Sequence, residues 1–261
     1  MMKINQPYFI LNNSPWPILM ALNSFNLMLS NIMIMNFKFN IISMLNLKLM
    51  MWVAYLWYSD IFSASTFYET CSINLMNLIQ VSMILFIISE MLLFISFFWN
   101  FLHNSLAPSI ELGLNWPPKN INFFNPLLIP LLNTVILLTS SFTITLTHFY
   151  MLNNLKLKSI KFMKLTIILS MYFLLLQMME YKQANFTFSD SIFGSSFYMA
   201  TGFHGLHVMI GTIFLMINLL RMYKMHFSHI HHISFELSAW YWHFIDIIWL
   251  FLYMTFYWWN N

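Results

Sequence analysis

Long runs without a charged side chain are the strongest limit on how this chain can fold. The segments Ile4–Phe37 and Ser191–Leu220 contain no Asp, Glu, Lys or Arg, and Thr70–Ile110 contains only one such residue, Glu90. An α-helix needs about 20 mostly apolar residues to cross the hydrocarbon core of a bilayer. Hydrophobic residues make up 60% of the chain and charged residues only 7%, which is too little polar surface to solvate a globule. The sequence therefore predicts an integral membrane protein.

The charge-poor runs divide the chain into seven predicted transmembrane helices. Glycine is scarce and strand-like alternation is not evident, which argues against a lipid-facing β-barrel. We therefore expect an all-α, polytopic membrane domain over residues 1–261. The expected spans are Trp16–Met35, Phe39–Ser59, Ile73–His103, Pro130–Tyr150, Lys161–Tyr181, Ser191–Leu220 and Ile233–Trp258.

The distribution of lysine and arginine predicts the orientation of these helices. With seven spans, the N-terminus and the second, fourth and sixth loops share one side of the membrane. Seven of the 11 cationic residues fall on that side. Lys and Arg concentrate in loops on the side where positive charge is retained. We expect the N-terminus to face that compartment and the C-terminus to face the opposite one.

Glu90 lies at the midpoint of Thr70–Ile110, a stretch that is otherwise free of charged residues. A carboxylate at that depth in a membrane is costly, so it indicates a functional site by default. The alternative is a protonated glutamic acid that is hydrogen-bonded to a neighbouring helix. The residue alone does not decide between these interpretations.

The last predicted span carries a polar face. Glu236, Trp240, His243 and Asp246 fall within a sector of about 120° when each residue turns 100° around a helix. Such a face predicts a polar seam packed against other helices, which we expect Glu90 and His207 to reach. Proton conduction is one interpretation of the seam. The other is a fixed polar network that sets helix packing.

Two histidines of the sixth span, His204 and His207, are three residues apart. A helical bundle that binds haem needs facing ligands at matching depth, whereas these two share one helical face. They can serve a single polar site, or they can be hydrogen-bonded interior histidines. We therefore expect no haem in this chain.

A second group of histidines follows Arg221 and Lys224 in the sixth loop: His226, His229, His231 and His232. Four imidazoles without a nearby carboxylate or cysteine would make a loose metal site, and Cys71 is the chain's single cysteine. Cationic side chains at a membrane interface suit an anionic lipid phosphate. The alternative is a solvated, positively charged loop. We expect no metal site here.

Six segments along the chain have distinctive sequences. They are SPWP at Ser14–Pro17, ILFIISEMLLFISFFW at Ile84–Trp99, SLAPSIELGLNWPP at Ser105–Pro118, NPLLIPLLNT at Asn125–Thr134, SDSIFGSSFYMATGFHGLHVMIGTIFL at Ser189–Leu215 and FELSAWYWHFIDIIWLFLYMTFYWW at Phe235–Trp259. These segments closely resemble the subunit III family of cytochrome c oxidase. The resemblance runs from about Ser14 to the C-terminus.

The resemblance implies a mitochondrially encoded, multi-pass subunit of complex IV in the mitochondrial inner membrane, with its N-terminus in the matrix. In that family the chain is a non-catalytic part of a proton-translocating oxidoreductase. Haem a and copper are then held by partner subunits, and no redox centre or metal is held here. The implied partners are subunit I as the main contact, other complex IV subunits and structural phospholipids including anionic lipid, with no nucleic acid. The implied role is to sustain proton uptake and to limit inactivation during turnover.

The resemblance also implies an internal organisation and a set of site residues. Helices one and two, residues 14–66, are separated from helices three to seven, residues 73–259, by a lipid-filled cleft. Glu90 matches the buried carboxylate of the family's third helix. The implied polar cleft contains His204, His207, Glu236, Trp240, His243 and Asp246. The implied lipid-binding residues are Tyr55, Trp57, Ser65, Thr66, Glu90, His207, Arg221, Lys224, His226, His231 and His232.

The chain departs from the family pattern near the end of the second helix. Ser59 and Ser63 stand where the family usually has arginine, Ala64 stands where it has glutamate, and Cys71 replaces a common histidine. Arginine binds phosphate through two parallel hydrogen bonds, which serine cannot reproduce. Lipid binding at that end of the second helix therefore lacks two of the cations that would pair with a phosphate.

An independent seven-helix, proton-coupled carrier or channel is the alternative function. Its relay would use Glu90, Glu236 and Asp246. Many carriers contain inverted repeats or paired broken helices, and neither is evident in this sequence. The family-like segments also occur in both halves of the chain, so the oxidase subunit is the favoured interpretation.

Overall fold

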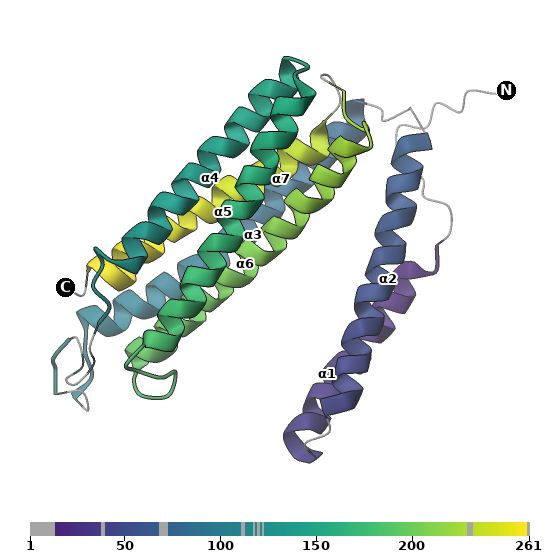
Figure 1. The fold of residues 1–261 in the computed structure, drawn as a ribbon. Helices are drawn as coiled ribbons and strands as arrows, with labels where there is room; N and C mark the ends of the chain where they lie inside the picture. The colour runs from purple at the N-terminus through teal and green to yellow at the C-terminus, as the bar shows by residue number, and fades with distance from the viewer. Residues whose placement is uncertain are drawn as a thin grey trace. The chain divides into compact units, whose positions relative to one another are not determined.

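The computed structural model is helical throughout the secondary structure that it describes. The elements are α1 (Trp16–Phe37), α2 (Asn40–Phe67), α3 (Ile73–Leu106), α4 (Ile129–Leu152), α5 (Lys156–Gln183), α6 (Ile192–Tyr223), α7 (Ile233–Leu252) and a short π-helix, η2 (Tyr253–Trp258) (Figure 1). The structure describes residues 14–37, 40–67, 73–110, 113–116, 118, 121, 123–228 and 232–259. Over these residues the predicted all-α fold is confirmed.

The chain divides into two units, Met1–Ile79 and Gln80–Asn261. In the first unit α1 and α2 pack against each other. The indole N–H of Trp16 at the start of α1 donates to the carboxylate of Asp60 near the end of α2, and Asn46 donates to the backbone carbonyl of Asn26. These contacts hold α1 and α2 together as an antiparallel pair, and the carboxylate of Asp60 is paired with the Trp16 indole.

The second unit is a five-helix bundle in which α4 and α5 make the most extensive contact (Figure 1). The buried residues of α5 recur every three or four positions and include Ser159, Thr166 and Ser170. Such small side chains let two membrane helices approach closely. Each of these three hydroxyls donates to a backbone carbonyl one turn earlier in the helix, so no hydroxyl is left unpaired in the apolar interior.

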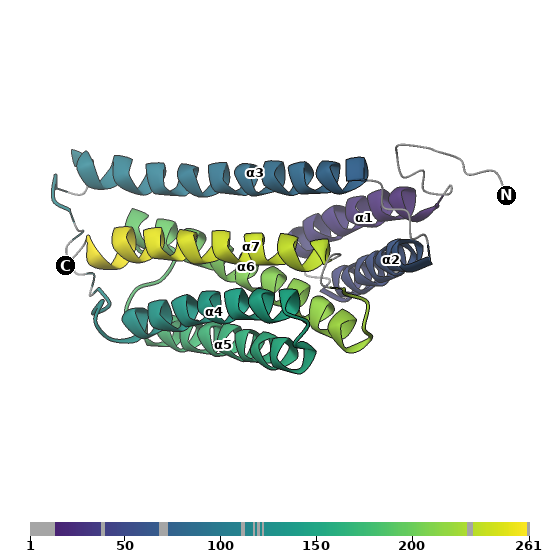
Figure 2. The ribbon, with the colours of Figure 1, turned by 90° about the horizontal axis from the view of Figure 1, so that it is seen from above.

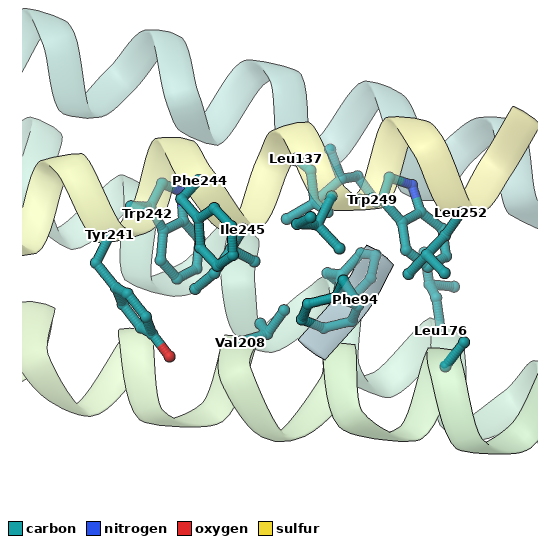
Figure 3. Close-up of a cluster of buried hydrophobic side chains, with 14 of the residues drawn as sticks. Phe94, Leu137, Leu176, Val208, Tyr241, Trp242, Phe244, Ile245, Trp249 and Leu252 are labelled. Carbon is teal, nitrogen blue, oxygen red and sulfur yellow. The ribbon is translucent and has the colours of Figure 1, made fainter. Parts of the chain in front are cut away.

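The core of the five-helix unit is built around α7, whose large side chains pack against the neighbouring helices (Figure 3). Trp242 and Trp249 are completely buried, and the indole of Trp242 donates to the hydroxyl of Ser140 on α4. Gly211 of α6 makes room for this packing: a Cβ there would lie 2.9 Å from Ile245 Cδ1 and 3.0 Å from Trp242 Cε3. A larger residue at this position would force both side chains to move.

Helix α3 forms an outer layer of the five-helix unit (Figure 2) and is joined to it mainly through long aromatic side chains. Phe94 packs edge-on against His207 of α6 and Phe244 of α7. Phe101 stacks obliquely on Phe256 at a centroid distance of 4.4 Å. Because the contacts are made by side chains, the position of α3 depends on these rings.

Among the described helices, six are long and apolar enough to cross a membrane. Helix α7 is the exception because Glu236, His243 and Asp246 lower its mean hydropathy. With η2 it still covers the predicted span Ile233–Trp258. Seven long helices were expected and seven are found in the described parts of the chain, although polar side chains make the seventh less apolar.

Two helices extend beyond the predicted spans. Helix α2 continues to Phe67, past the predicted end of the span at Ser59, and α5 begins at Lys156, before the predicted start at Lys161. The early start of α5 is possible because lysines at a helix end reach out of the apolar zone. The ammonium of Lys158 lies 5.5 Å from the ring centroid of Tyr150. The ammonium of Lys164 lies 5.3 Å from the ring centroid of Tyr223.

These lysine contacts identify one end of the five-helix unit, where α4 ends, α5 begins, α6 ends and α7 begins (Figure 1). We call this the basic end. Its cationic residues are Lys156, Lys158, Lys161, Lys164, Arg221 and Lys224.

Candidate functional site

Glu90 of α3 and His207 of α6 form a contact midway along both helices. Glu90 Oε2 lies 2.8 Å from His207 Nε2. The Glu90 side chain is 23% exposed and that of His207 is 10% exposed. The fold thus brings together two residues that are 117 positions apart in the chain.

Hydrogen bonding fixes how many protons this pair holds. His207 Nδ1 lies 2.6 Å from the backbone carbonyl of Phe203, and a carbonyl oxygen can only accept, so Nδ1 carries a proton. The Nε2 contact then needs one proton, which resides either on the Glu90 carboxyl or on Nε2. The pair is neutral overall in both states. It can therefore lie in a membrane interior and can shift a proton over a short distance.

Aromatic rings surround the Glu90–His207 pair. Phe94 contacts the imidazole at a centroid distance of 5.2 Å and Tyr241 at 6.4 Å. Both rings are almost completely buried, and both are drawn in Figure 3. They limit access of water from the core side and hold the imidazole in position.

His204 does not join His207 in one polar site, although the two share a helix. Its ring lies 5.1 Å from that of Trp249 and 5.7 Å from that of Phe173. Both imidazole nitrogens are buried without a hydrogen-bond partner among the described residues. The indole and phenyl rings enclose His204 while His207 turns toward α3, and a polar cleft that includes His204 stays a prediction.

The expected polar seam of α7 is divided into separate contacts. His243 Nδ1 lies 2.6 Å from the hydroxyl of Ser141 on α4. Asp246 is buried beside Ser141, yet neither carboxylate oxygen makes a hydrogen bond of normal geometry with a described residue. Trp240 is exposed. No described hydrogen bond or ion pair joins these residues to Glu90 or His207, so a single continuous seam does not form.

Glu236 lies in another contact, at the basic end. Its Oε1 is 3.1 Å from His232 Nε2 and 3.9 Å from His148 Nε2. The two imidazole Nε2 atoms are 3.1 Å apart. Sequence reasoning did not single out His148, because it stands alone near the end of an apolar span.

Arg221 belongs to a polar cluster between α6 and α7. Its guanidinium donates to the hydroxyl of Ser234 and lies 4.7 Å from the Phe227 ring centroid. Asn218 donates to the backbone carbonyl of Ser234 and to the hydroxyl of Ser238. The guanidinium is partly used in joining the two helices, which restricts its orientation toward any ligand.

The remaining predicted lipid residues are found in different settings. Lys224 and His226 are exposed at the basic end, whereas His232 is buried. Tyr55 is exposed and Trp57 half-buried on α2. Ser65 and Thr66 belong to α2, with only their backbone described, and His231 lies outside the described residues. Because His232 is enclosed by His148 and Glu236, it does not belong to an exposed lipid-binding surface.

One buried carboxylate escaped the sequence analysis. Glu180 of α5 is fully buried, and the Tyr257 hydroxyl of η2 donates to its Oε1 at 2.5 Å. Nearby, Asn133 of α4 donates to Gln177 Oε1. The sequence did carry one indication that Glu180 is buried: with Gln177 it continues the buried face of α5 by one more helical turn.

Comparison with known proteins gives a consistent result over the full chain. A model of the family described as cytochrome c oxidase subunit III matches residues 6–261. The chain is 48% identical to cytochrome c oxidase subunit 3 of Struthio camelus over 256 residues, 97% of each chain. It is 46% identical to that of Aedes aegypti over 98% of each chain, and 45% identical to that of Pisaster ochraceus over 100% of each chain.

Proposed function

The chain belongs to the cytochrome c oxidase subunit III family, and we propose that it is an accessory core subunit of complex IV that holds no redox centre itself. In this role it supports electron transfer from cytochrome c to oxygen by the catalytic subunit, and the proton pumping coupled to it. Haem a and copper belong to the partner subunits. The match over the whole chain is the observation that carries this proposal.

Within the oxidase, the Glu90–His207 pair is proposed to support proton uptake. The pair is neutral with its one shared proton, so it can relay a proton without a net charge in the membrane when one proton arrives as another leaves. Its mid-helix position and partial exposure support a proposed contact with a neighbouring subunit or lipid. Loss of this function is expected to hasten inactivation of the enzyme during turnover.

The proposed setting is the mitochondrial inner membrane, with the N-terminus and the basic end on the matrix side. The cations of the basic end support this orientation, because positive charge concentrates on the retained side. Subunit I is the proposed main contact. The large apolar surface of the spanning helices is available to other complex IV subunits and to lipid.

Anionic phospholipid is proposed to bind at the basic end. Lys224 and His226 are exposed there, and Arg221 presents a guanidinium already oriented by Ser234. Such cations suit a phosphate headgroup at an interface. Tyr55 and Trp57 of α2 remain proposed lipid contacts, and the lipid-filled cleft stays a prediction.

Purification through a tag on this chain tests the proposed role. The native complex, extracted in mild detergent, is expected to show haem a and copper, and the separated chain is expected to show neither. The same chain expressed without the other subunits serves as the control for adventitious metal.

Two results would contradict the proposal. The first is a chain that purifies as a stable membrane protein free of any oxidase, which would favour the independent carrier. The second is haem or copper that stays with the separated chain in stoichiometric amount.

A further inference from the structure

Three side chains with metal-binding atoms meet at the basic end of the five-helix unit. They are His148 near the end of α4, His232 at the N-cap of α7 and Glu236 in the first turn of α7. The fold brings together His148 and His232, which are 84 residues apart in the chain. The histidines of the sixth loop do not form this group by themselves, because they lack both His148 and a carboxylate.

The distances between the three ligand atoms match those of a metal site. The His148 and His232 Nε2 atoms are 3.1 Å apart, and Glu236 Oε1 is 3.1 Å from one and 3.9 Å from the other. The circle through these three atoms has a radius of about 2.0 Å, close to zinc–nitrogen bond lengths of about 2.0–2.1 Å. An ion near its centre would contact all three atoms with little side-chain movement.

The orientation of His232 also suits metal binding. Its Nδ1 lies 3.3 Å from the backbone carbonyl of Ser228, and because a carbonyl only accepts, Nδ1 carries the proton. The Nε2 lone pair of the neutral ring then points toward His148 and Glu236. Histidine ligands of metals usually donate their other ring N–H in this way, which fixes the tautomer.

Backbone position fixes the carboxylate. His232 and Glu236 are four residues apart, so their side chains share one face at the start of α7. A carboxylate in the first turn interacts favourably with the helix dipole. An ionised Glu236 and two neutral imidazoles form a donor set that zinc binds in proteins.

The group is closed on one side and open on the other. The His232 side chain is only 3% exposed, whereas those of Glu236 and His148 are 27% and 40% exposed. An ion can reach the site from outside the bundle, and a fourth position is available to water. Sites with three protein ligands and water in the fourth position are common for zinc.

We propose that His148, His232 and Glu236 bind one Zn²⁺ ion, with water as the fourth ligand. The ion would join the end of α4 to the start of α7 and so fix the adjoining sixth loop. The alternative is a metal-free hydrogen-bonded group in which His148 donates from Nε2 to His232 or Glu236. The two differ in whether zinc is retained, which can be measured without reference to activity.

Zinc binding to the assembled oxidase tests this proposal. The complex is treated with a chelator, dialysed against micromolar Zn²⁺, and its zinc content is determined together with the zinc X-ray absorption spectrum. His148→Gln is the primary variant, because the residue is half-exposed and the change keeps a polar side chain. We expect the variant complex to bind one zinc ion fewer than the wild type and to lose the X-ray absorption signal of two imidazole ligands. Its zinc affinity should fall about 100-fold or more, since loss of an outer-shell partner alone lowers metal affinity about 10–100-fold.

His103→Gln is the matched control, since His103 is an exposed histidine of α3 that stacks on Trp99 away from the group. It should keep the full zinc content. Equal zinc content in the wild type and the His148→Gln variant would overturn the proposal. If the variant complex does not assemble, zinc-soaked wild-type crystals decide: an anomalous peak within bonding distance of the three side chains supports the site, and its absence refutes it.

Discussion

Two glutamates, Glu90 and Glu180, lie in membrane-spanning helices of the five-helix unit and differ in what they contact. Glu90 is partly exposed and contacts an imidazole, whereas Glu180 is fully buried and accepts from the phenol of Tyr257. An imidazole can take up a proton near neutral pH, but a phenol neither gains nor loses one readily there. The partner therefore distinguishes a carboxylate that can exchange a proton from one that holds a helix in place.

The two pairs also differ in how they can respond to change. The Glu180 side chain is fully buried, whereas that of Glu90 is 23% exposed. The Glu90 pair is open on one side. We expect changes at Glu180 to affect stability most and changes at Glu90 to affect function most.

The largest expected effect on stability is that of Glu180→Ala. The change removes the Glu180 acceptor of the buried Tyr257 hydroxyl and opens a cavity, which together are expected to cost about 3 kcal/mol. Thermal release of this subunit from the purified oxidase measures the loss. Glu180→Gln is the control, since its amide oxygen still accepts from Tyr257. Equal stability of the Ala variant and the wild type would contradict the structural role.

His207→Ala is expected to have a smaller effect, about 1–2 kcal/mol. The Glu90 carboxyl loses its partner, but it keeps the shared proton and stays neutral, so no charge is left in the membrane. A double-mutant cycle with Glu90→Gln isolates the contact, and we expect a coupling of about 1 kcal/mol. Strictly additive effects in the same thermal assay would show that the two side chains do not interact.

Glu90→Gln alone is expected to leave assembly intact and to change stability by less than about 1 kcal/mol. The glutamine amide can donate to His207 Nε2, while His207 Nδ1 still donates to the Phe203 carbonyl. Subunit content and thermal unfolding check this expectation. A loss of more than about 2 kcal/mol would instead indicate that Glu90 is ionised and pairs with an imidazolium, since removing one partner of such a pair is costly.

The smallest effect concerns Asp190, a carboxylate in the loop between α5 and α6. The backbone N–H of Thr187 donates to Asp190 Oδ2 at 2.7 Å, and this bond lowers the pKa of the fully exposed carboxyl. The lowered pKa means that Asp190 stabilises the loop above the ordinary aspartate pKa of about 3.9. That contribution is lost as the pH falls through the lower, folded-state value.

Hydrogen exchange of the Thr187 amide measures this loop directly. In the wild type, protection should fall as the solution is acidified below the ordinary aspartate pKa. In Asp190→Asn it should be weaker at neutral pH and independent of this titration. An acid-dependent loss of protection that persists in the Asn variant would assign the effect to another group.

Much of the architecture could be predicted from local sequence, because the uncharged runs determine the helices. Glu90 was detectable for the same reason, since it stands alone in a long uncharged stretch. Glu180 was not, because it lies near a helix end beside Lys182, where a charge is ordinary. His148 was equally inconspicuous. Which side chains meet depends on how each helix is rotated about its axis, and that follows from packing, such as the approach of Trp242 to Gly211.

The central claim is that Glu90, through His207, supports proton uptake by the oxidase. The most direct measurement compares oxidase containing Glu90→Gln with oxidase containing Glu180→Gln, in vesicles, by the rate of proton uptake and the number of turnovers before inactivation. We predict slower uptake and earlier inactivation for Glu90→Gln, and wild-type behaviour for Glu180→Gln. Wild-type uptake and lifetime in the Glu90→Gln enzyme would contradict the claim.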